Sequence, residues 1–437
     1  MDRAAVDTEA SNKVECINNY QEDDIEKISV QEDHGRGNGS FVTAYFNIVC
    51  AVAGTGTLGL PAAFAKGGWL GILILFLSYG MAVYSGIVLI RCLYHKPGQR
   101  LSDFKAMGTA AFGTVGYLVA SFLHYLYLFG CPALYLVLAA GNITQLLEGT
   151  SGALTRPIWT IIVGLFLLVP LLLLKTLREV TAVSAIGAIC TMMAVFIILI
   201  LSPLDRNNHP DRVVHHDPVI WSGFPSALAT IAFSFGGNNT YPHVEYALKR
   251  PQQWPLALVA GLSTCTILYF LTAVPAYWAY GSDSASPIYY SLPTGPGQLI
   301  TIVVMTIHVI FAVPIYATSF SLEFETWTRA TDDRLGKFGA WVARAVIRSC
   351  TMAILVLLAI FVPYFDDFMS LIGALANCGL VFLLPVLCYL KLTGVKNKPI
   401  YELAFCGLTV ILGLIGLVIG TKDAIIALVA DFEHAKK

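Results

Sequence analysis

Charged residues are scarce in this sequence. Of its 437 residues, 13% are Asp, Glu, Lys or Arg and 56% are hydrophobic, whereas a soluble domain carries about 25% charged residues. Charge is missing above all from recurrent apolar runs of the roughly 20 residues that a helix needs to cross a bilayer. The sequence is therefore predicted to be an all-α integral membrane protein, and a soluble fold is excluded.

The absence of several other motifs argues against particular classes of function. The sequence has no CxxC pair and no cysteine cluster in an outside loop, which argues against a disulfide framework or a zinc site. No basic stretch is interleaved with aromatic residues, so we expect no nucleic-acid partner. There is no catalytic constellation and no metal-ligand spacing, and we therefore expect neither an enzyme nor a bound cofactor.

The first 40 residues differ in composition from the rest. They hold ten acidic residues and four Lys or Arg, with few large apolar residues. Such a segment buries too little apolar surface to fold alone, and it lacks the apolar core of a signal peptide. Residues 1–40 are predicted to form a disordered cytosolic tail.

The apolar runs predict eleven transmembrane helices. They are 41–64, 70–93, 114–146, 157–174, 181–202, 225–248, 254–280, 297–322, 341–362, 367–390 and 400–420. The third is long enough to cross at a steep tilt or to extend past the membrane. Residues 421–437 are assigned to a C-terminal tail, although the stretch 401–431 would allow the last helix to extend further.

The loops between these spans differ in positive charge. One alternating set of loops holds sixteen Lys and Arg residues and the other holds four. Cytosolic loops carry the excess of positive charge, so the first set is placed in the cytosol. The N-terminus is then cytosolic. With an odd number of spans, the C-terminus lies outside or in a lumen.

The first and sixth spans contain segments that do not suit a continuous helix. Span one carries three glycines and a proline within residues 54–61, and span six carries two glycines and a proline within residues 235–242. Non-helical backbone persists at membrane depth only where it is buried in protein or lines a water-filled cavity. Two such breaks predict a binding site.

The spacing of the two breaks also carries information. They lie five spans apart, so the two broken helices run in opposite directions through the bilayer. This arrangement is typical of two inverted five-helix repeats with the substrate site at their interface. The transporter domain 41–420 is therefore divided into repeat one (about 41–202), repeat two (about 225–390) and an extra helix (about 400–420).

The chemistry of the site follows from the helix ends. Where a helix stops and restarts, unpaired carbonyl groups face one way and unpaired amides the other. The amide end attracts an anion such as a carboxylate, and the carbonyl end attracts an ammonium or metal cation. A site with both ends exposed suits a zwitterion, and free amino acids are the obvious candidates.

The glycines of span one have two other possible roles. The spacing Gly54-x-Gly56-x-x-Gly59 matches the dinucleotide-binding fingerprint, but that motif requires a preceding strand and a βαβ unit. The glycines are alternatively close-packing positions between helices. Two such segments at matched positions favour the binding site over packing alone.

Several residues around the breaks resemble a known family. They are Phe46-Asn47, Gly54-x-Gly56-x-Leu58-Gly59-Leu60-Pro61, Gly67-Gly68-Trp69, Ile90-Arg91-Cys92-Leu93-Tyr94 and Phe235-Gly236-Gly237 with Pro242. In these, from about residue 40 to 420, the sequence resembles the amino acid/auxin permease family. That family includes the vesicular inhibitory amino acid transporters and the vacuolar amino acid transporters of fungi.

The resemblance implies an amino-acid-polyamine-organocation (LeuT-like) fold of 5+5 inverted repeats and amino acid transport by alternating access. By position, it implies that the backbone part of the substrate is held by Gly54, Thr55, Gly56, Thr57, Leu58, Phe235, Gly236, Gly237, Asn238 and Asn239. Members are usually driven by protons, and one branch by sodium. Sodium-coupled members tend to have asparagine where Cys50 stands here, so we favour protons.

Ionisable groups inside spans are costly and are therefore candidates for ion coupling. Glu245 and His243 follow the second break, although Glu245 is also placed to form an ordinary ion pair with Lys249. His308 and His124 are further candidates, with a satisfied buried histidine as the alternative.

Hydroxyl and aromatic side chains supply further candidates. Thr318 and Ser319 would suit a cation site together with carbonyls of span one, unless their hydroxyls bond their own helix backbone. Tyr125, Tyr127 and Tyr135 in span three would shape the side-chain end of the pocket, with core packing as the alternative.

The working hypothesis is a proton-coupled secondary amino acid transporter in the plasma membrane or in a vacuolar or vesicular membrane. Its partners are a small amino acid and the lipid bilayer. Sodium coupling is one alternative, and an amino-acid sensor without net flux is another. The sequence does not identify the amino acid, the direction of transport or the oligomeric state.

Overall fold

The computed structural model describes residues 37–96, 98–173, 178–330, 332–396 and 398–434. Most of the predicted tail, residues 1–36, lies outside the described residues. What is described is helical, apart from short connections and two isolated β-bridges, Gly39–Leu248 and Lys96–Gln99. The all-helical expectation is therefore confirmed.

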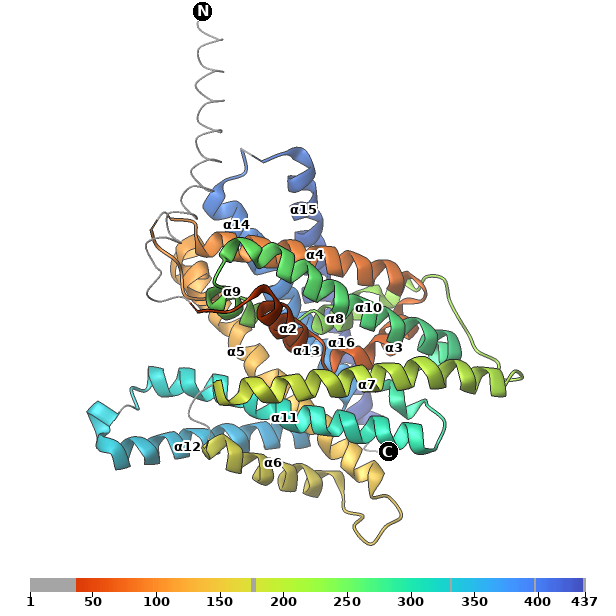
Figure 1. The fold of residues 1–437 in the computed structure, drawn as a ribbon. Coiled ribbons are helices and arrows are strands. Elements are labelled where there is room, and N and C mark those ends of the chain that lie inside the picture. Colours follow the sequence, from red (N-terminus) through yellow and green to blue (C-terminus); the bar gives the residue numbers. More distant parts are fainter. Residues whose placement is uncertain (1–36, 97, 174–177, 331, 397, 435–437) are drawn as a thin grey trace, which may run out of the picture.

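The helices are joined by connections of different lengths (Figure 1). The α-helices are α2 (Phe41–Val52), α3 (Gly56–Gly67), α4 (Leu70–Leu93), α5 (Phe104–Leu146), α6 (Arg156–Leu173), α7 (Arg178–Asn208), α8 (Phe224–Ser234), α9 (Tyr241–Ala247), α10 (Trp254–Tyr280), α11 (Pro296–Trp327), α12 (Asp332–Phe361), α13 (Phe365–Ile372), α14 (Leu384–Thr393), α15 (Ile400–Ile415) and α16 (Thr421–His434). Two π-helical segments, Gly373–Leu383 and Gly416–Gly420, join α13 to α14 and α15 to α16.

The described residues contain nine helices that are long and apolar enough to cross a membrane, or ten if the bent pair α2–α3 is one span. The chain is thus an integral membrane protein. The stretch predicted as span six consists here of α8, α9 and the segment between them, each too short to meet that criterion. The count of eleven stays a prediction.

Most predicted boundaries lie close to the helix ends. The range 70–93 coincides with α4, whereas α5 begins ten residues before the predicted start at 114. Within α5, Gly113 adopts φ 62° and ψ −142°, a conformation that only glycine adopts readily, so the first turns form a separate arm. At the other end, helix continues through α16 to His434, beyond the predicted end at 420.

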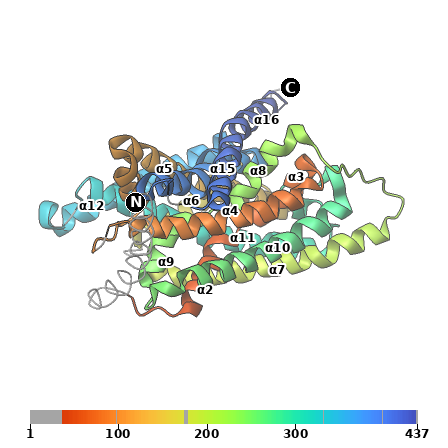
Figure 2. The ribbon, with the colours of Figure 1, turned by 90° about the horizontal axis from the view of Figure 1, so that it is seen from above.

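The broken segments lie inside the bundle (Figures 1 and 2). In both views α2 and α9 lie toward one end of α10, whereas α3 lies toward the other. Helix α3 packs against α8, and α2 packs against α9. The two interrupted segments therefore run in opposite directions, as the five-span spacing predicts.

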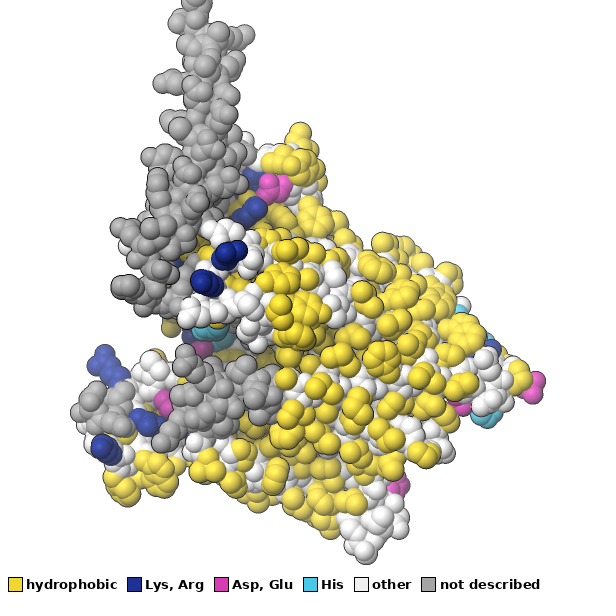
Figure 3. Space-filling model, in the orientation of Figure 1, with side chains coloured by type: hydrophobic (Ala, Val, Ile, Leu, Met, Phe, Trp, Pro, Cys, Tyr) yellow, Lys and Arg dark blue, Asp and Glu magenta, His cyan; other side chains and the backbone are white. Residues whose placement is uncertain are grey.

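The outer surface is apolar. Exposed large hydrophobic side chains are numerous on α6, α7, α12 and α15, among them Leu165, Phe166, Phe196 and Phe361. Figure 3 shows hydrophobic side chains over a broad band of one face, with Lys and Arg gathered toward one end. This distribution is expected for a protein surrounded by lipid.

Candidate substrate site

The first break lies between Val52 and Gly56. Helix α2 ends where Ala53 turns to an extended conformation (φ −74°, ψ 92°), and α3 restarts at Gly56 with its axis bent by 55°. The Thr55 side chain makes no capping hydrogen bond. The break expected from the glycine and proline content of this segment is present at the predicted position.

The second break begins after Ser234. Residues Phe235 to Gly237 leave the helix, Asn238–Thr240 form a short 3-10 turn, and α9 starts at Tyr241. Pro242 occupies the first turn of α9, where its missing N–H costs no helical hydrogen bond. A proline that would disrupt a continuous span here begins a new helix.

The two breaks meet in space. A Cβ atom on Gly56 would lie 2.7 Å from Cα of Ser234, so only glycine allows this approach. The hydroxyl of Tyr269 on α10 is 2.8 Å from the carbonyl oxygen of Val52, and it also hydrogen-bonds the carbonyl of Ser234. One buried hydroxyl group thus joins the last residues of α2 and α8.

A cavity of about 510 Å³ lies at this meeting point, a size suited to a small molecule. Of the predicted site residues and candidates, those that line it are Gly54, Thr55, Gly56, Gly236, Asn239, Tyr127, Tyr135, His124, His243, His308 and Ser319. They come from the first break, α5, the second break, α9 and α11. The structure therefore brings both glycine segments and most of the proposed coupling residues around one space.

Unpaired backbone groups flank the first break. In the part of the chain that the structure describes, the amides of Gly54, Thr55 and Gly56 have no hydrogen-bonding partner, and neither do the carbonyls of Cys50 and Ala51. All five residues line the cavity. The amides lie at the start of α3 and the carbonyls at the end of α2, so the cavity offers donors for an anion and acceptors for a cation.

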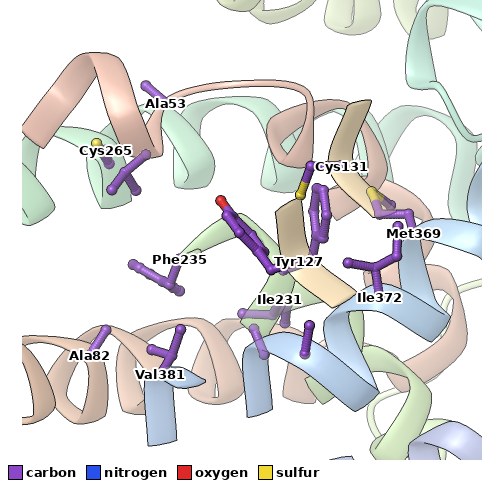
Figure 4. Close-up of a cluster of buried hydrophobic side chains, with 14 of the residues drawn as sticks. Ala53, Ala82, Tyr127, Cys131, Ile231, Phe235, Cys265, Met369, Ile372 and Val381 are labelled. Carbon is purple, nitrogen blue, oxygen red and sulfur yellow. The ribbon is translucent and has the colours of Figure 1, made fainter. Parts of the chain in front are cut away.

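The end of α8 differs, because its carbonyls are occupied. Asn377 donates its Nδ2 to the carbonyl of Phe233 at 3.1 Å, and Tyr127 donates its hydroxyl to the carbonyl of Gly236. Figure 4 shows Tyr127 and Phe235 in one buried cluster with apolar side chains of α13. These contacts fix the second break instead of leaving it open to a ligand.

His308 offers one further acceptor. Its Nδ1 lies 2.9 Å from the carbonyl oxygen of Gly187, so Nδ1 carries a proton that it donates. Its Nε2 is buried without a partner, and a Cβ atom on Gly54 would lie only 3.5 Å from it. The lone pair of Nε2 therefore points to the first break.

A polar network extends from the second break. His124 lies 3.2 Å from Oδ1 of Asn239 through Nδ1 and 2.8 Å from Oε1 of Glu323 through Nε2. The other carboxylate oxygen of Glu323 lies 2.6 Å from Nζ of Lys105. His124, Asn239 and Glu323 all line the cavity, so this network connects the cavity to a positive charge at the start of α5.

Glu245 lies outside the cavity. It is fully buried, and its Oε2 lies 3.1 Å from Nη2 and 3.2 Å from Nε of Arg100, while Tyr94 donates to Oε1 at 2.9 Å. Arg100 also donates to the carbonyl of Pro242 at 2.6 Å. The ion-pair interpretation of Glu245 thus has a structural basis, with Arg100 as a partner that sequence spacing did not indicate.

Seven other predicted residues do not line the cavity. They are Thr57, Leu58, Phe235, Gly237, Asn238, Tyr125 and Thr318. Asn238 donates to the carbonyl of Leu380 at 3.3 Å, and the ring of Tyr125 packs on Phe320. The Thr318 hydroxyl is buried without a partner, whereas Ser319 donates to the carbonyl of Ile315 in its own helix.

Four residues that line the cavity or hydrogen-bond its lining were not predicted from the sequence. They are Glu323, Tyr269, Asn377 and Lys105. Glu323 is an acidic residue near the end of an apolar run, so it could have been singled out by its charge. Nothing in the sequence distinguishes Tyr269 or Asn377 from the other polar residues of the spans, because their roles depend on where α10 and α13–α14 pass the breaks.

The architecture is shared with solved transporter structures. The chain is similar to a Na⁺-coupled sialic acid symporter in a substrate-bound outward-open state, with 13% identity, a TM-score of 0.54, and coverage of 92% of this chain and 93% of that one. It is also similar to Mhp1, a nucleobase-cation-symport-1 family transporter, with 13% identity and a TM-score of 0.53, over 91% and 94% of the two chains. The protein thus has the LeuT-like fold.

Sequence comparison identifies the family. The model described as transmembrane amino acid transporter protein matches residues 37–426, and the chain belongs to that family, which consists of transporters and not enzymes. This confirms the resemblance to the amino acid/auxin permeases. Similar proteins include Arabidopsis thaliana amino acid transporters AVT1C (27% identical, covering 89% of this chain and 70% of that one) and AVT1J (26%; 92% and 94%). The human vesicular inhibitory amino acid transporter is 27% identical over 83% of this chain and 73% of its own.

Proposed function

We propose that this chain is a proton-coupled secondary transporter that holds a zwitterionic amino acid at the first break. The observation that carries the proposal is the set of unpaired groups around the cavity: the amides of Gly54, Thr55 and Gly56 on one side and the carbonyls of Cys50 and Ala51 on the other. The substrate carboxylate accepts from the amides, which lie at the positive end of the α3 dipole.

The ammonium group of the substrate is held on the other side of the break. The carbonyls of Cys50 and Ala51 lie at the negative end of α2, and Nε2 of His308 adds an unpartnered acceptor beside Gly54. An ammonium group has three N–H donors, which matches three acceptors. The side chain is left to the part of the cavity lined by Tyr127, Tyr135 and other apolar residues.

The coupling proton is carried by His124 and Glu323. If Oδ1 of Asn239 faces Nδ1 of His124, both ring nitrogens must donate, because Glu323 also accepts; the imidazole is then protonated. If the Asn239 amide turns over, its NH₂ donates to Nδ1 and the imidazole is neutral. Deprotonation of His124 is thereby linked to the orientation of the Asn239 amide, which belongs to the second break.

Transport proceeds by alternating access, with the cavity open to one side of the membrane at a time. We place the N-terminus in the cytosol and the C-terminus outside or in a lumen, as the loop charges predict. Because the human relative is a vesicular transporter, we favour a vesicular or vacuolar membrane over the plasma membrane. No cofactor is expected.

Uptake of labelled amino acids into proteoliposomes tests the proposal. The purified full-length chain is reconstituted with an imposed pH gradient, without one, and with sodium replaced by choline. Accumulation that requires the pH gradient and ignores sodium supports the proposal. Accumulation that requires sodium and ignores pH overturns the proton assignment, and the buried Thr318 hydroxyl is then the first candidate ligand.

A separate assay decides between a transporter and a sensor. Counterflow requires the loaded carrier to cycle between two open states, whereas binding requires only one. Saturable binding of an amino acid with no counterflow in the same vesicles would favour the sensor and contradict the transport proposal.

A further inference from the structure

A second cavity of about 880 Å³ lies away from the two breaks, where the ends of α6 and α11 meet the first half of α12. It is lined by Leu172, Leu173, Leu322, Glu325, Thr326, Arg329, Ala330, Arg334, Trp341, Arg344, Ala345 and Arg348. It shares only Leu322 with the substrate cavity. The space therefore forms no part of the proposed transport site.

Positive charge dominates the polar lining. Four arginines line the cavity against one acidic residue, Glu325. Arg348 is bonded to Glu325 at 2.8 Å and to the carbonyl of Leu171 at 2.7 Å, so this pair ties α12 to α11 and α6. Arg348 is thereby paired with Glu325, and Arg344 donates its Nε to the carbonyl of Ala330 at 3.4 Å. The positive charges at the mouth of the cavity are therefore those of Arg329 and Arg334.

The arginines at the mouth have donors to spare. Arg329 and Arg334 are exposed, and Arg334 donates one N–H to the carbonyl of Thr328 at 3.3 Å. Capping the end of α11 in this way uses one of the five N–H groups of a guanidinium. Asp332 and Asp333 occur in the same stretch of sequence, and their side chains lie outside the described atoms.

The rest of the lining is apolar. Leu172, Leu173 and Leu322 line the side toward the spans, and Trp341 stands at the rim with 63% of its surface exposed. Tryptophan is enriched where a membrane protein passes the headgroup region. A ligand that fills this cavity must therefore combine an anionic group with long apolar chains.

We propose that this cavity binds an anionic phospholipid. The phosphate accepts hydrogen bonds from Arg329 and Arg334, and the acyl chains lie along Leu172 and Leu173 toward the bilayer. Arginine recognises phosphate through two parallel N–H groups. Basic pockets between helices at the membrane surface are suited to such headgroups. Figure 3 shows Lys and Arg side chains gathered at this end of the molecule.

Lipid binding to the full-length protein tests this inference. The protein is purified in detergent and titrated with dioleoylphosphatidylglycerol, with the zwitterionic dioleoylphosphatidylcholine, and with soluble glycerol 3-phosphate. Bound lipid is counted by native mass spectrometry. We expect tighter binding of the phosphatidylglycerol by about fivefold or more for each arginine that contacts it. Equal binding of both lipids would overturn the proposal, and so would equal binding of the soluble phosphate.

Variants locate the binding to this cavity. Arg329→Gln with Arg334→Gln should weaken phosphatidylglycerol binding by about 25-fold and leave transport in phosphatidylcholine vesicles unchanged. Lys391→Gln with Lys396→Gln removes the same charge from two exposed positions, one in the last turn of α14 and one in the loop that follows it. The charge pattern assigns both to the same membrane side, and this variant should have less than a twofold effect.

An equal loss in both double variants would mean a general surface-charge effect and would contradict a cavity site. If the arginine double variant cannot be purified, Arg329→Gln alone is measured. A loss of about fivefold is then expected, and an unchanged dissociation constant would overturn the proposal.

Discussion

Gly56 and Ser234 are in direct contact across the centre of the protein: a Cβ atom on Gly56 would lie 2.7 Å from the Ser234 Cα. Gly56 begins α3 and Ser234 ends α8, so this contact joins the two repeats at their breaks. Because the Cα of Ser234 is a backbone atom, no side-chain rotation could make room for a Cβ atom on Gly56. The same contact places the free amides of the first break within reach of residues from the second.

Alanine at Gly56 should therefore disrupt the crossing, whereas alanine at Gly54 should not. A Cβ atom on Gly54 would meet only Nε2 of His308 at 3.5 Å and the Tyr135 hydroxyl at 3.8 Å, which are ordinary contacts. We expect Gly56→Ala to cost about 1–3 kcal/mol and to lower the apparent melting temperature. Gly54→Ala should keep the fold and raise KM, because it narrows the cavity.

Thermal stability in detergent and uptake kinetics in proteoliposomes measure the two effects. Equal melting temperatures for the two variants would contradict the close crossing. An unchanged KM for Gly54→Ala would mean that the substrate does not approach this residue.

Removing the hydroxyl of Tyr269 should loosen both breaks. Tyr269→Phe leaves the carbonyls of Val52 and Ser234 without the donor they share, and a buried group left unpaired costs about 1–3 kcal/mol. The matched control is Tyr79→Phe. This variant loses the hydrogen bond between Tyr79 on α4 and Ser263, which lies on α10 like Tyr269 but away from the breaks. Melting temperature and uptake should fall in Tyr269→Phe only; a similar fall in both would argue against a special role.

The helical architecture and the position of both breaks could be predicted from the sequence, because apolar length and glycine and proline content act locally. Of the residues predicted for the site, some line the cavity and others do not. Gly54 and Gly56 line the cavity, yet Gly237 contacts Val52 and Tyr241 instead. The packing of neighbouring helices decides which residues of a short broken segment line the cavity. A local sequence pattern contains no information about that packing.

The ion-pair partners of buried charged residues were also not predictable from local sequence. Lys249 was the residue that helical spacing offered to Glu245, and the structure adds Arg100 from a loop 145 positions away in sequence. The long α5 and the continuation into α16 were cut short in the prediction, since a hydropathy pattern locates apolar residues and not the ends of helices that project beyond them.

The two nitrogens of His308 should have separable roles. His308→Asn places an amide where Nδ1 lies and keeps the donor to the Gly187 carbonyl, but it removes the acceptor at Nε2. If Nε2 accepts from the substrate ammonium, a bond worth about 1.5 kcal/mol is lost and KM should rise about tenfold with kcat nearly unchanged.

His308→Gln has the opposite design, because it keeps an acceptor near Nε2 and loses the bond to Gly187. It should lower the melting temperature more than His308→Asn and affect KM less. Concentration-dependent uptake and thermal unfolding distinguish the two variants. If the KM of His308→Gln were higher than that of His308→Asn, Nε2 of His308 would not be the group that accepts from the substrate.

Neutralising Glu323 should separate substrate movement from proton movement. Glu323→Gln keeps the size of the side chain but removes the negative charge that lies between His124 and Lys105, so a protonated His124 loses its counter-ion. Uptake driven by a pH gradient should fall at least tenfold, while counterflow exchange of labelled for unlabelled amino acid persists. Glu148→Gln, on an exposed loop, should leave both activities unchanged. Gradient-driven accumulation by Glu323→Gln at the unaltered rate would mean that the proton takes another route, and Glu323 would then be an ordinary ion-pair partner of Lys105.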